Sequence, residues 1–166
     1  FESLPEVIED GNTFVENAIK KVSATTPSND VIYIAEDSGI EVEALDGRPG
    51  IFSARYAGKD ASREDMCNKL LTELGNDTNR NAQYQAAIAI RFPDNTIQTV
   101  SGIVKGTLAQ SMRGKEGFGY DPIFIPNGYE KTFGELPKEL KNTISHRFNA
   151  IQKMKETINK YLESNT

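Results

Sequence analysis

Residues 117–122 read Gly-Phe-Gly-Tyr-Asp-Pro, and Lys141 and the Ser-His-Arg triplet at 145–147 follow them along the chain. Glycine lets a backbone turn sharply or come close to a ligand, so this segment is typical of a ligand-facing loop. The rings of Phe118 and Tyr120 could stack on a flat base, and the basic side chains that follow could hold phosphate oxygens. Together these residues indicate a nucleotide site, whereas residues 117–122 alone also fit a turn that carries core aromatics.

Two adjacent carboxylates form a second group of reactive side chains. Residues 31–35 are β-branched, aromatic or small, which is typical of a strand, and Glu36 and Asp37 follow directly. After Ser38 and a glycine, apolar and acidic residues alternate over residues 40–44, the pattern of a second, half-buried strand. Carboxylates at a strand end offer oxygen ligands to a hard divalent cation. The alternative is an acidic pair that is simply solvated.

Composition limits the classes of protein that fit. The 166 residues, 37% hydrophobic and 26% charged, are enough for one domain with a real core. The net charge of −5 argues against a broad nucleic-acid-binding face, so a phosphate-rich ligand would need local cations or a metal. No apolar run approaches the ~20 residues of a membrane span, and we expect no membrane partner. The lone Cys67, expected to be a buried thiol, fits a reducing, cytoplasmic location.

These residues need a framework of helices and strands to position them. Thr13 and Glu16 have the spacing of a capping box, and Gly75 is a typical helix end. Residues 93–95 predict a turn between two strands, and hence an antiparallel hairpin. We expect an α/β fold around a mixed central sheet flanked by helices. Its predicted helices are 13–24, 62–74 and 145–162, and its predicted strands are 31–35, 40–44, 82–92, 96–104 and 123–125.

The start of the last predicted helix is suited to an anion. Ser145 is a good N-cap residue, and His146 and Arg147 then fall in the first turn, where free backbone N–H groups and the helix dipole favour negative charge. An arginine there makes sense if a phosphate or a base oxygen meets it. The alternative for His146, the only histidine, is a buried ring that is hydrogen-bonded in the core.

Five segments, taken in order, closely resemble the non-canonical purine nucleoside triphosphate pyrophosphatases, the inosine/xanthosine triphosphatase or Ham1-like family. They recur at about the spacing of that family from Leu4 to Met154, and five motifs in order make chance a poor explanation. The matching segments are residues 13–18 (Thr-Phe-Val-Glu-Asn-Ala), 35–39 (Ala-Glu-Asp-Ser-Gly), 49–58, 117–124 and 145–147 (Ser-His-Arg).

The resemblance implies a fold and an activity. The fold would be a single ITPase-like domain over residues 1–166, two-lobed with a nucleotide cleft. The activity would be a hydrolase reaction that splits the bond between the α- and β-phosphates of ITP, dITP and XTP and removes these non-canonical purines from the nucleotide pool. The family requires Mg²⁺, for which Mn²⁺ could substitute, and its members are commonly homodimers.

The resemblance also implies roles for particular side chains. Asp37 would be the catalytic carboxylate, binding Mg²⁺ or accepting a proton from the attacking water, beside the second carboxylate of Glu36. Lys21 looks like the family lysine that approaches the phosphates. Glu9 is the best match to a metal-binding glutamate, with Glu6 as the alternative. The implied substrate contacts are Ser38, Phe118, Gly119, Tyr120, Asp121, Lys141, His146 and Arg147.

Two other functions and one departure from the family bear on this assignment. A Maf-like nucleotide pyrophosphatase shares the architecture, but the 145–147 triplet after Lys141 speaks against it. A nucleotide-binding module without catalysis is the other alternative, because the family's N-terminal strand and its Thr/Ser-Gly-Asn-x-x-Lys phosphate loop do not occur ahead of residue 13. We expect the sequence to be a piece of a longer protein; if it were complete, we would expect poor stability and severely reduced activity.

Overall fold

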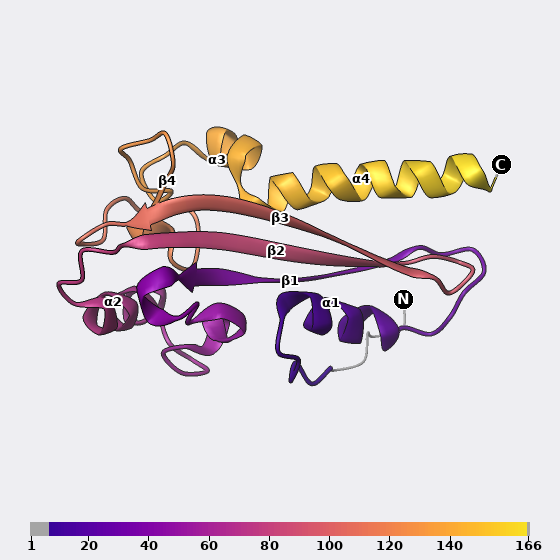
Figure 1. Ribbon diagram of the computed structural model, residues 1–166, viewed down its shortest axis with the longest axis horizontal. Helices are drawn as coiled ribbons and strands as arrows, with labels where there is room; N and C mark the ends of the chain where they lie inside the picture. Colours follow the sequence, from indigo (N-terminus) through magenta and orange to yellow (C-terminus); the bar gives the residue numbers. More distant parts are fainter. Residues whose placement is uncertain (1–6, 166) are drawn as a thin grey trace.

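The computed structural model describes residues 7–165, which fold as an α/β protein, as predicted (Figure 1). Three long strands lie side by side, with helices above and below them in the view of Figure 1. In chain order the helices and strands are α1 (Phe14–Ser23), β1 (Tyr33–Val42), α2 (Arg63–Leu74), β2 (Asn81–Arg91), β3 (Ile97–Leu108), β4 (Phe124–Pro126), α3 (Lys138–Ile144) and α4 (His146–Ser164). Short 3₁₀ turns occur at Glu43–Leu45, Gly50–Arg55 and Asp121–Ile123.

The described strands form one sheet in the order β1-β2-β3-β4. Each pair of neighbours is antiparallel, so the expected mixture of parallel and antiparallel pairs is not seen in residues 7–165. For β2 and β3 the reason is connectivity, because the predicted hairpin joins them through a turn that contains Asn95 at φ 66°. In the middle of the sheet Asp37 lies opposite Ala87, and Ala87 lies opposite Ser101.

The acidic pair does not lie at the end of a strand, and this corrects the sequence prediction. Glu36 and Asp37 are interior residues of β1, a single ten-residue strand that includes the whole stretch expected to separate two strands. The ladder with β2 continues through Glu36, Asp37 and Ser38. A strand tolerates these side chains because successive residues point to opposite faces, where cations from α1 and α4 meet the two carboxylates.

Two helices cover opposite faces of the sheet. On one face α1 buries Phe14, Ala18 and Val22 against small alanines of β2. On the other face α4 packs along β2 and β3, so the strands lie between the two helices (Figure 1). Gly102 of β3 lets α4 come close, since a Cβ there would lie 2.2 Å from the backbone nitrogen of Ala150. This packing fixes where the first turn of α4 stands over β1.

The helix ends follow the capping signals of the sequence. Thr13 caps α1 by accepting a hydrogen bond from the Glu16 N–H. Ser62 and Asp65 form a complete capping box at α2, and Ser145 caps α4. A separate apolar core joins α2 to the long loop after β3, and Cys67 is fully buried there, as predicted. No helix in residues 7–165 is long and apolar enough to cross a membrane.

Candidate active site

Asp37 is held from two directions by side chains of α1. The Lys21 ammonium donates to Asp37 Oδ1 at 2.9 Å and to the Glu36 carbonyl at 3.0 Å. The Asn17 amide donates to Asp37 Oδ2 at 3.2 Å. Asn17 and Lys21 are one helical turn apart, so both reach the same side of β1. The carboxylate of Asp37 is therefore almost buried, paired and fixed in orientation.

Glu36 and Ser38 face the other side of the strand, where Arg147 meets them. Arg147 Nε donates to Glu36 Oε1 at 2.8 Å, and its terminal nitrogen lies 3.2 Å from the Ser38 hydroxyl. The planar guanidinium can donate in two directions at once, which a lysine cannot do with the same geometry. The first turn of α4 is thus tied to the middle of β1.

The ring of Phe118 lies against two cations. Lys141 Nζ stands 4.3 Å and the Arg147 guanidinium carbon 4.8 Å from its centroid, distances at which a ring attracts a cation. About half of Phe118 is exposed, and Gly117 and Gly119 beside it have φ values of 74° and 54°. The loop therefore presents an accessible aromatic surface next to positive charge.

Asp121 holds the 117–122 loop in place through buried contacts. It is 2% exposed, it pairs with the buried Lys141 ammonium, and it accepts the Phe118 N–H at 2.7 Å. The Tyr84 hydroxyl donates to its other oxygen at 3.5 Å. A buried carboxylate with a cation and a backbone donor fixes both partners, so Asp121 positions the Phe118 ring and the Lys141 ammonium together.

His146 is buried at the start of α4, 3% exposed, and its ring stacks on Tyr84 with 4.8 Å between centroids and 8° between planes. Burial, with smaller contributions from the charges of Arg147 and Lys141, lowers the pKa of His146 to about 3. The ring is therefore neutral at physiological pH. Its Nδ1 is a buried atom without a hydrogen-bond partner among the described residues, so the ring is buried in the core but not fully hydrogen-bonded there.

Tyr120 and Gly119 lie deeper than Phe118. Tyr120 is 3% exposed, its hydroxyl donates to the Ser53 carbonyl at 2.8 Å, and burial raises the pKa of this phenol. The Gly119 carbonyl accepts from the Cys67 thiol at 3.6 Å, and burial raises the pKa of that thiol to about 12. Both residues therefore lie on the buried side of the Phe118 loop. The thiol of Cys67 is protonated at neutral pH.

Two of the carboxylates predicted to hold a metal face a common cation. Lys21 Nζ lies 3.1 Å from Glu9 Oε1 and 2.9 Å from Asp37 Oδ1. In residues 7–165 no three His, Cys, Asp or Glu side chains gather closely enough to hold a metal. Two carboxylates still fit Mg²⁺, which commonly takes one or two protein carboxylates with water and substrate phosphates completing its shell. Glu6, the alternative ligand, lies outside the described residues.

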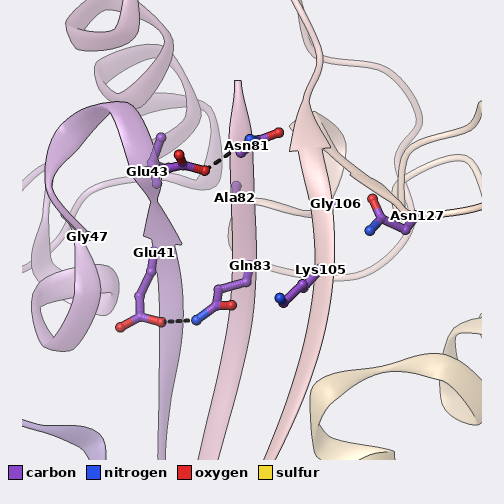
Figure 2. A pocket seen from close by; sticks show the side chains of 10 residues that line it. Glu41, Glu43, Gly47, Asn81, Ala82, Gln83, Lys105, Gly106 and Asn127 are labelled. Atoms are coloured by element: carbon purple, nitrogen blue, oxygen red, sulfur yellow. Dashed lines mark hydrogen bonds between the residues drawn. The ribbon is translucent and has the colours of Figure 1, made fainter. Parts of the chain in front are cut away.

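A separate hollow of about 540 Å³ lies over one end of the sheet (Figure 2). Across neighbouring strands Gln83 donates to Glu41 at 2.7 Å, and Asn81 donates to Glu43 at 3.0 Å. Lys105 continues the row on β3, opposite Gln83. The hollow contains none of the predicted site residues, so the two-lobed cleft stays a prediction.

The molecule is an α/β protein with a polar site across strand β1. Charged residues from α1, β1, the 117–122 loop and α4 form this site. Within this site the structure brings Glu9, Lys21 and Asp37 together on one face, and Glu36, Ser38, Phe118, Lys141 and Arg147 on the other. Sequence reasoning missed Asn17, although it belongs to the 13–18 segment that carried the resemblance. Its signal was an amide on the otherwise apolar face of a predicted helix.

Comparison with known proteins identifies the family. The profile of the Ham1 family matches residues 1–157. The dITP/XTP pyrophosphatase of Desulfotalea psychrophila is 45% identical over 93% of this chain and 70% of its own length. That of Staphylococcus aureus strain MW2 is 49% identical over 88% of this chain and 75% of its own length. The chain belongs to the Ham1 family.

Solved structures agree with this assignment. The Staphylococcus aureus Ham1 protein aligns with a TM-score of 0.84 and 44% identity, covering 97% of this chain and 82% of that one. A HAM1 protein from Coxiella burnetii aligns with a TM-score of 0.88 and 37% identity, covering 95% and 82%. The family resemblance and the α/β fold expected from the sequence are therefore confirmed.

Proposed function

We propose that this protein is a nucleoside triphosphate pyrophosphatase that hydrolyses dITP, XTP and ITP to the monophosphate and pyrophosphate. Its relatives at 45–49% identity are named dITP/XTP pyrophosphatases. The observation that carries the proposal is the arrangement around β1: the paired carboxylate Asp37 on one face, and cations next to an exposed aromatic ring on the other. These are the groups that a triphosphate and a purine base need.

The positions of the side chains support a direct attack by water. A water oxygen attacks the α-phosphorus, the bond to the bridging oxygen of the β-phosphate breaks, and pyrophosphate leaves. Asp37, fixed by Lys21 and Asn17, is the base that accepts the proton of this water. The Lys21 ammonium offsets charge that develops on the phosphate oxygens, which is an effective form of transition-state stabilisation.

Asp37 and Glu9 are the residues that would hold Mg²⁺, with Mn²⁺ as a substitute. Both contact the same ammonium, so their oxygens face one place where positive charge is stabilised. When bound, the ion would polarise a phosphoryl oxygen and neutralise part of the triphosphate charge. The chain has a net charge of −5, so a tetra-anionic substrate needs this neutralisation along with the lysines.

Base selection belongs to the other face of β1. The exposed ring of Phe118 is available to stack on a purine, and the Arg147 guanidinium and loop N–H groups supply donors. Hypoxanthine and xanthine present an oxygen at position 6, whereas adenine presents an amino group. A buried donor that faces the wrong partner costs about 1–3 kcal/mol, which corresponds to ~10- to 100-fold discrimination per contact.

The test is Mg²⁺-dependent release of pyrophosphate from dITP, XTP and ITP, compared with dATP and GTP. We expect fast release from the first three. Asp37→Asn should lower kcat by roughly 10²- to 10⁴-fold, since it removes the base, and it should leave the fold intact. Asp60→Asn, at an exposed position, is the matched control. Binding of ITP without pyrophosphate release would support the alternative of a binding module, and equal turnover of dATP would contradict the proposed selectivity.

The family resemblance predicts a homodimer, and the single cysteine predicts a cytoplasmic location; both stay predictions. Light scattering on the purified protein tests the first. A monomeric mass over the whole range of working concentrations would contradict it.

A further inference from the structure

Asn17 is a fully buried polar side chain in the middle of α1. Its residue exposure is 0%, and the other buried residues of the same helix are Phe14, Ala18 and Val22. Asparagine is also a weak helix former, because its side chain competes for backbone hydrogen bonds. A buried amide is costly unless both of its ends find partners. The position of Asn17 on an apolar helix face therefore indicates a specific role for its amide.

Both ends of the Asn17 amide are used. Its Nδ2 donates to Asp37 Oδ2 at 3.2 Å, and its Oδ1 accepts the Gly11 N–H at 2.8 Å. The contact with Gly11 is close, since a Cβ on Gly11 would lie 2.6 Å from Asn17 Oδ1. One side chain therefore connects the segment that carries Glu9 to the carboxylate in the middle of β1.

The two donors on Asp37 divide its oxygens between them. Lys21 holds Oδ1 and Asn17 holds Oδ2. The ammonium of Lys21 also contacts Glu9, and the Lys21 side chain is about one quarter exposed, so it is accessible to a phosphate. Asn17 is out of reach of solvent. Of the two donors to Asp37, Asn17 is therefore the one that a phosphate cannot reach.

We propose that Asn17 is a positioning residue that fixes the orientation of the Asp37 carboxylate for proton abstraction and metal binding. The inference rests on the proposed function, since it gives Asn17 a purpose only if Asp37 does the chemistry. Asn17 touches neither the substrate nor the reacting atoms and acts through Asp37 alone. The 13–18 segment thereby gains a functional role in addition to forming the helix.

Two substitutions separate the two ends of the amide. Asn17→Ala removes both contacts. Asn17→Asp keeps the shape and an oxygen to accept the Gly11 N–H, but it replaces the donor to Asp37 with a second carboxylate. Val22→Ala leaves a cavity on the apolar side of the same helix and removes no polar contact, so it is the control for a loss of stability alone. All three are assayed for kcat and KM with dITP, with unfolding in urea measured alongside.

We expect Asn17→Ala and Asn17→Asp each to lower kcat by about 10- to 100-fold with little change in KM, the range seen when outer partners of ligating groups are removed. Val22→Ala should keep a near-normal kcat. Normal kcat in Asn17→Asp would overturn the proposal, because the Gly11 contact alone would then explain the amide. So would an equal loss of kcat in Val22→Ala.

A second readout does not depend on turnover. Binding of Mn²⁺, followed by electron paramagnetic resonance with an unhydrolysable α,β-methylene analogue of dITP, should weaken in Asn17→Ala by about tenfold and be unchanged in Val22→Ala. Unchanged Mn²⁺ binding in Asn17→Ala would refute the positioning role. Asp37→Asn in the same assays separates the proposed active site from the positioning role of Asn17. Full turnover in Asp37→Asn would contradict the active site itself. A collapse of turnover in Asp37→Asn, together with normal turnover in the Asn17 variants, would contradict only the positioning role.

Discussion

Arg147 and Glu36 are joined by a hydrogen bond of 2.8 Å although 111 positions separate them in the chain. The bond links the first turn of α4 to the middle of β1. The same guanidinium also reaches Ser38 and lies against the Phe118 ring. Arg147 therefore uses its nitrogens and the face of its guanidinium at once, and this arrangement places a cation beside the strand that carries Asp37.

Arg147→Lys should weaken substrate binding although it keeps the charge. A lysine ammonium cannot donate from two nitrogens of one planar group, and it cannot stack its face on the Phe118 ring as the guanidinium does. Losing a charge-assisted hydrogen bond costs about 1.5–3 kcal/mol, or roughly 10- to 100-fold in affinity. We expect KM for dITP to rise by this factor. The free energy of unfolding should change by less than about 1 kcal/mol, because the pair with Glu36 is partly exposed and such pairs contribute little. Steady-state kinetics and urea unfolding measure the two quantities.

The control for this substitution is Arg91→Lys, at an arginine that also donates in two directions but at the end of β2. Its guanidinium reaches the Thr25 carbonyl at 2.8 Å and the Asn95 side chain at 2.9 Å. The KM of this variant should be normal. A normal KM in Arg147→Lys as well would show that the fork geometry of Arg147 is not used on the nucleotide.

Much of the fold could be predicted from local patterns. The capping signals at Thr13 and Ser145 predicted two helix starts correctly, and the turn at residues 93–95 predicted the hairpin. Local patterns failed at Glu36 and Asp37, where polar residues suggested the end of a strand. The strand continues there because cations from α1 and α4, remote in sequence, compensate the carboxylates.

The sequence named candidate residues for the site, but it could not predict their contacts with one another. Motif order named Asp37, Lys141 and Arg147, yet no spacing rule says that β1 divides the site into two faces. Asn17 was missed for a related reason: its value depends on Asp37, twenty positions away. Tertiary contacts of this kind are set by packing of the whole chain and leave no local periodicity.

Asp121→Asn should destabilise the protein by about 3–5 kcal/mol, the usual cost of leaving one partner of a buried ion pair uncompensated. Asp121 and Lys141 are 2% and 8% exposed, so water cannot replace the lost charge. The double variant Asp121→Asn with Lys141→Met removes both charges and should recover part of the loss. Urea unfolding of the wild type, the single variant and the double variant checks this. A change below about 1 kcal/mol in the single variant would contradict the pairing.

Stability should fall as the pH drops below about 6.5, and His146 should account for part of this fall. Its pKa in the folded protein is lowered to about 3 by burial and by the charges of Arg147 and Lys141. Between the folded pKa and the unfolded one, the unfolded chain binds the extra proton, so stability rises with pH in this window and the effect ends above it. One proton changes stability by at most about 1.4 kcal/mol per pH unit.

His146→Gln should remove that part of the pH dependence. The measurement is the free energy of unfolding of both proteins from about pH 4 to about pH 8, a range that crosses the upper end of the window. The free energies of unfolding of the two proteins, plotted against pH, should run parallel above the window. They should approach each other as the pH falls through the window, because only the wild type loses the stability that comes from the neutral His146 ring. Parallel curves throughout would mean that the ring is not buried in its neutral form.

Gly102→Ala should disturb the site from a distance. A Cβ at Gly102 would lie 2.2 Å from the His146 carbonyl oxygen and from the Ala150 nitrogen. Both are backbone atoms of α4, so the helix must move away from β3. Overpacking of this kind costs about 1–3 kcal/mol or more, and the movement carries His146 and Arg147 with it. We therefore expect lower stability together with a higher KM for dITP, whereas Ser101→Ala on the neighbouring residue should leave both nearly unchanged. A Gly102→Ala protein with normal stability and KM would show that α4 does not need this close approach to hold Arg147 over β1.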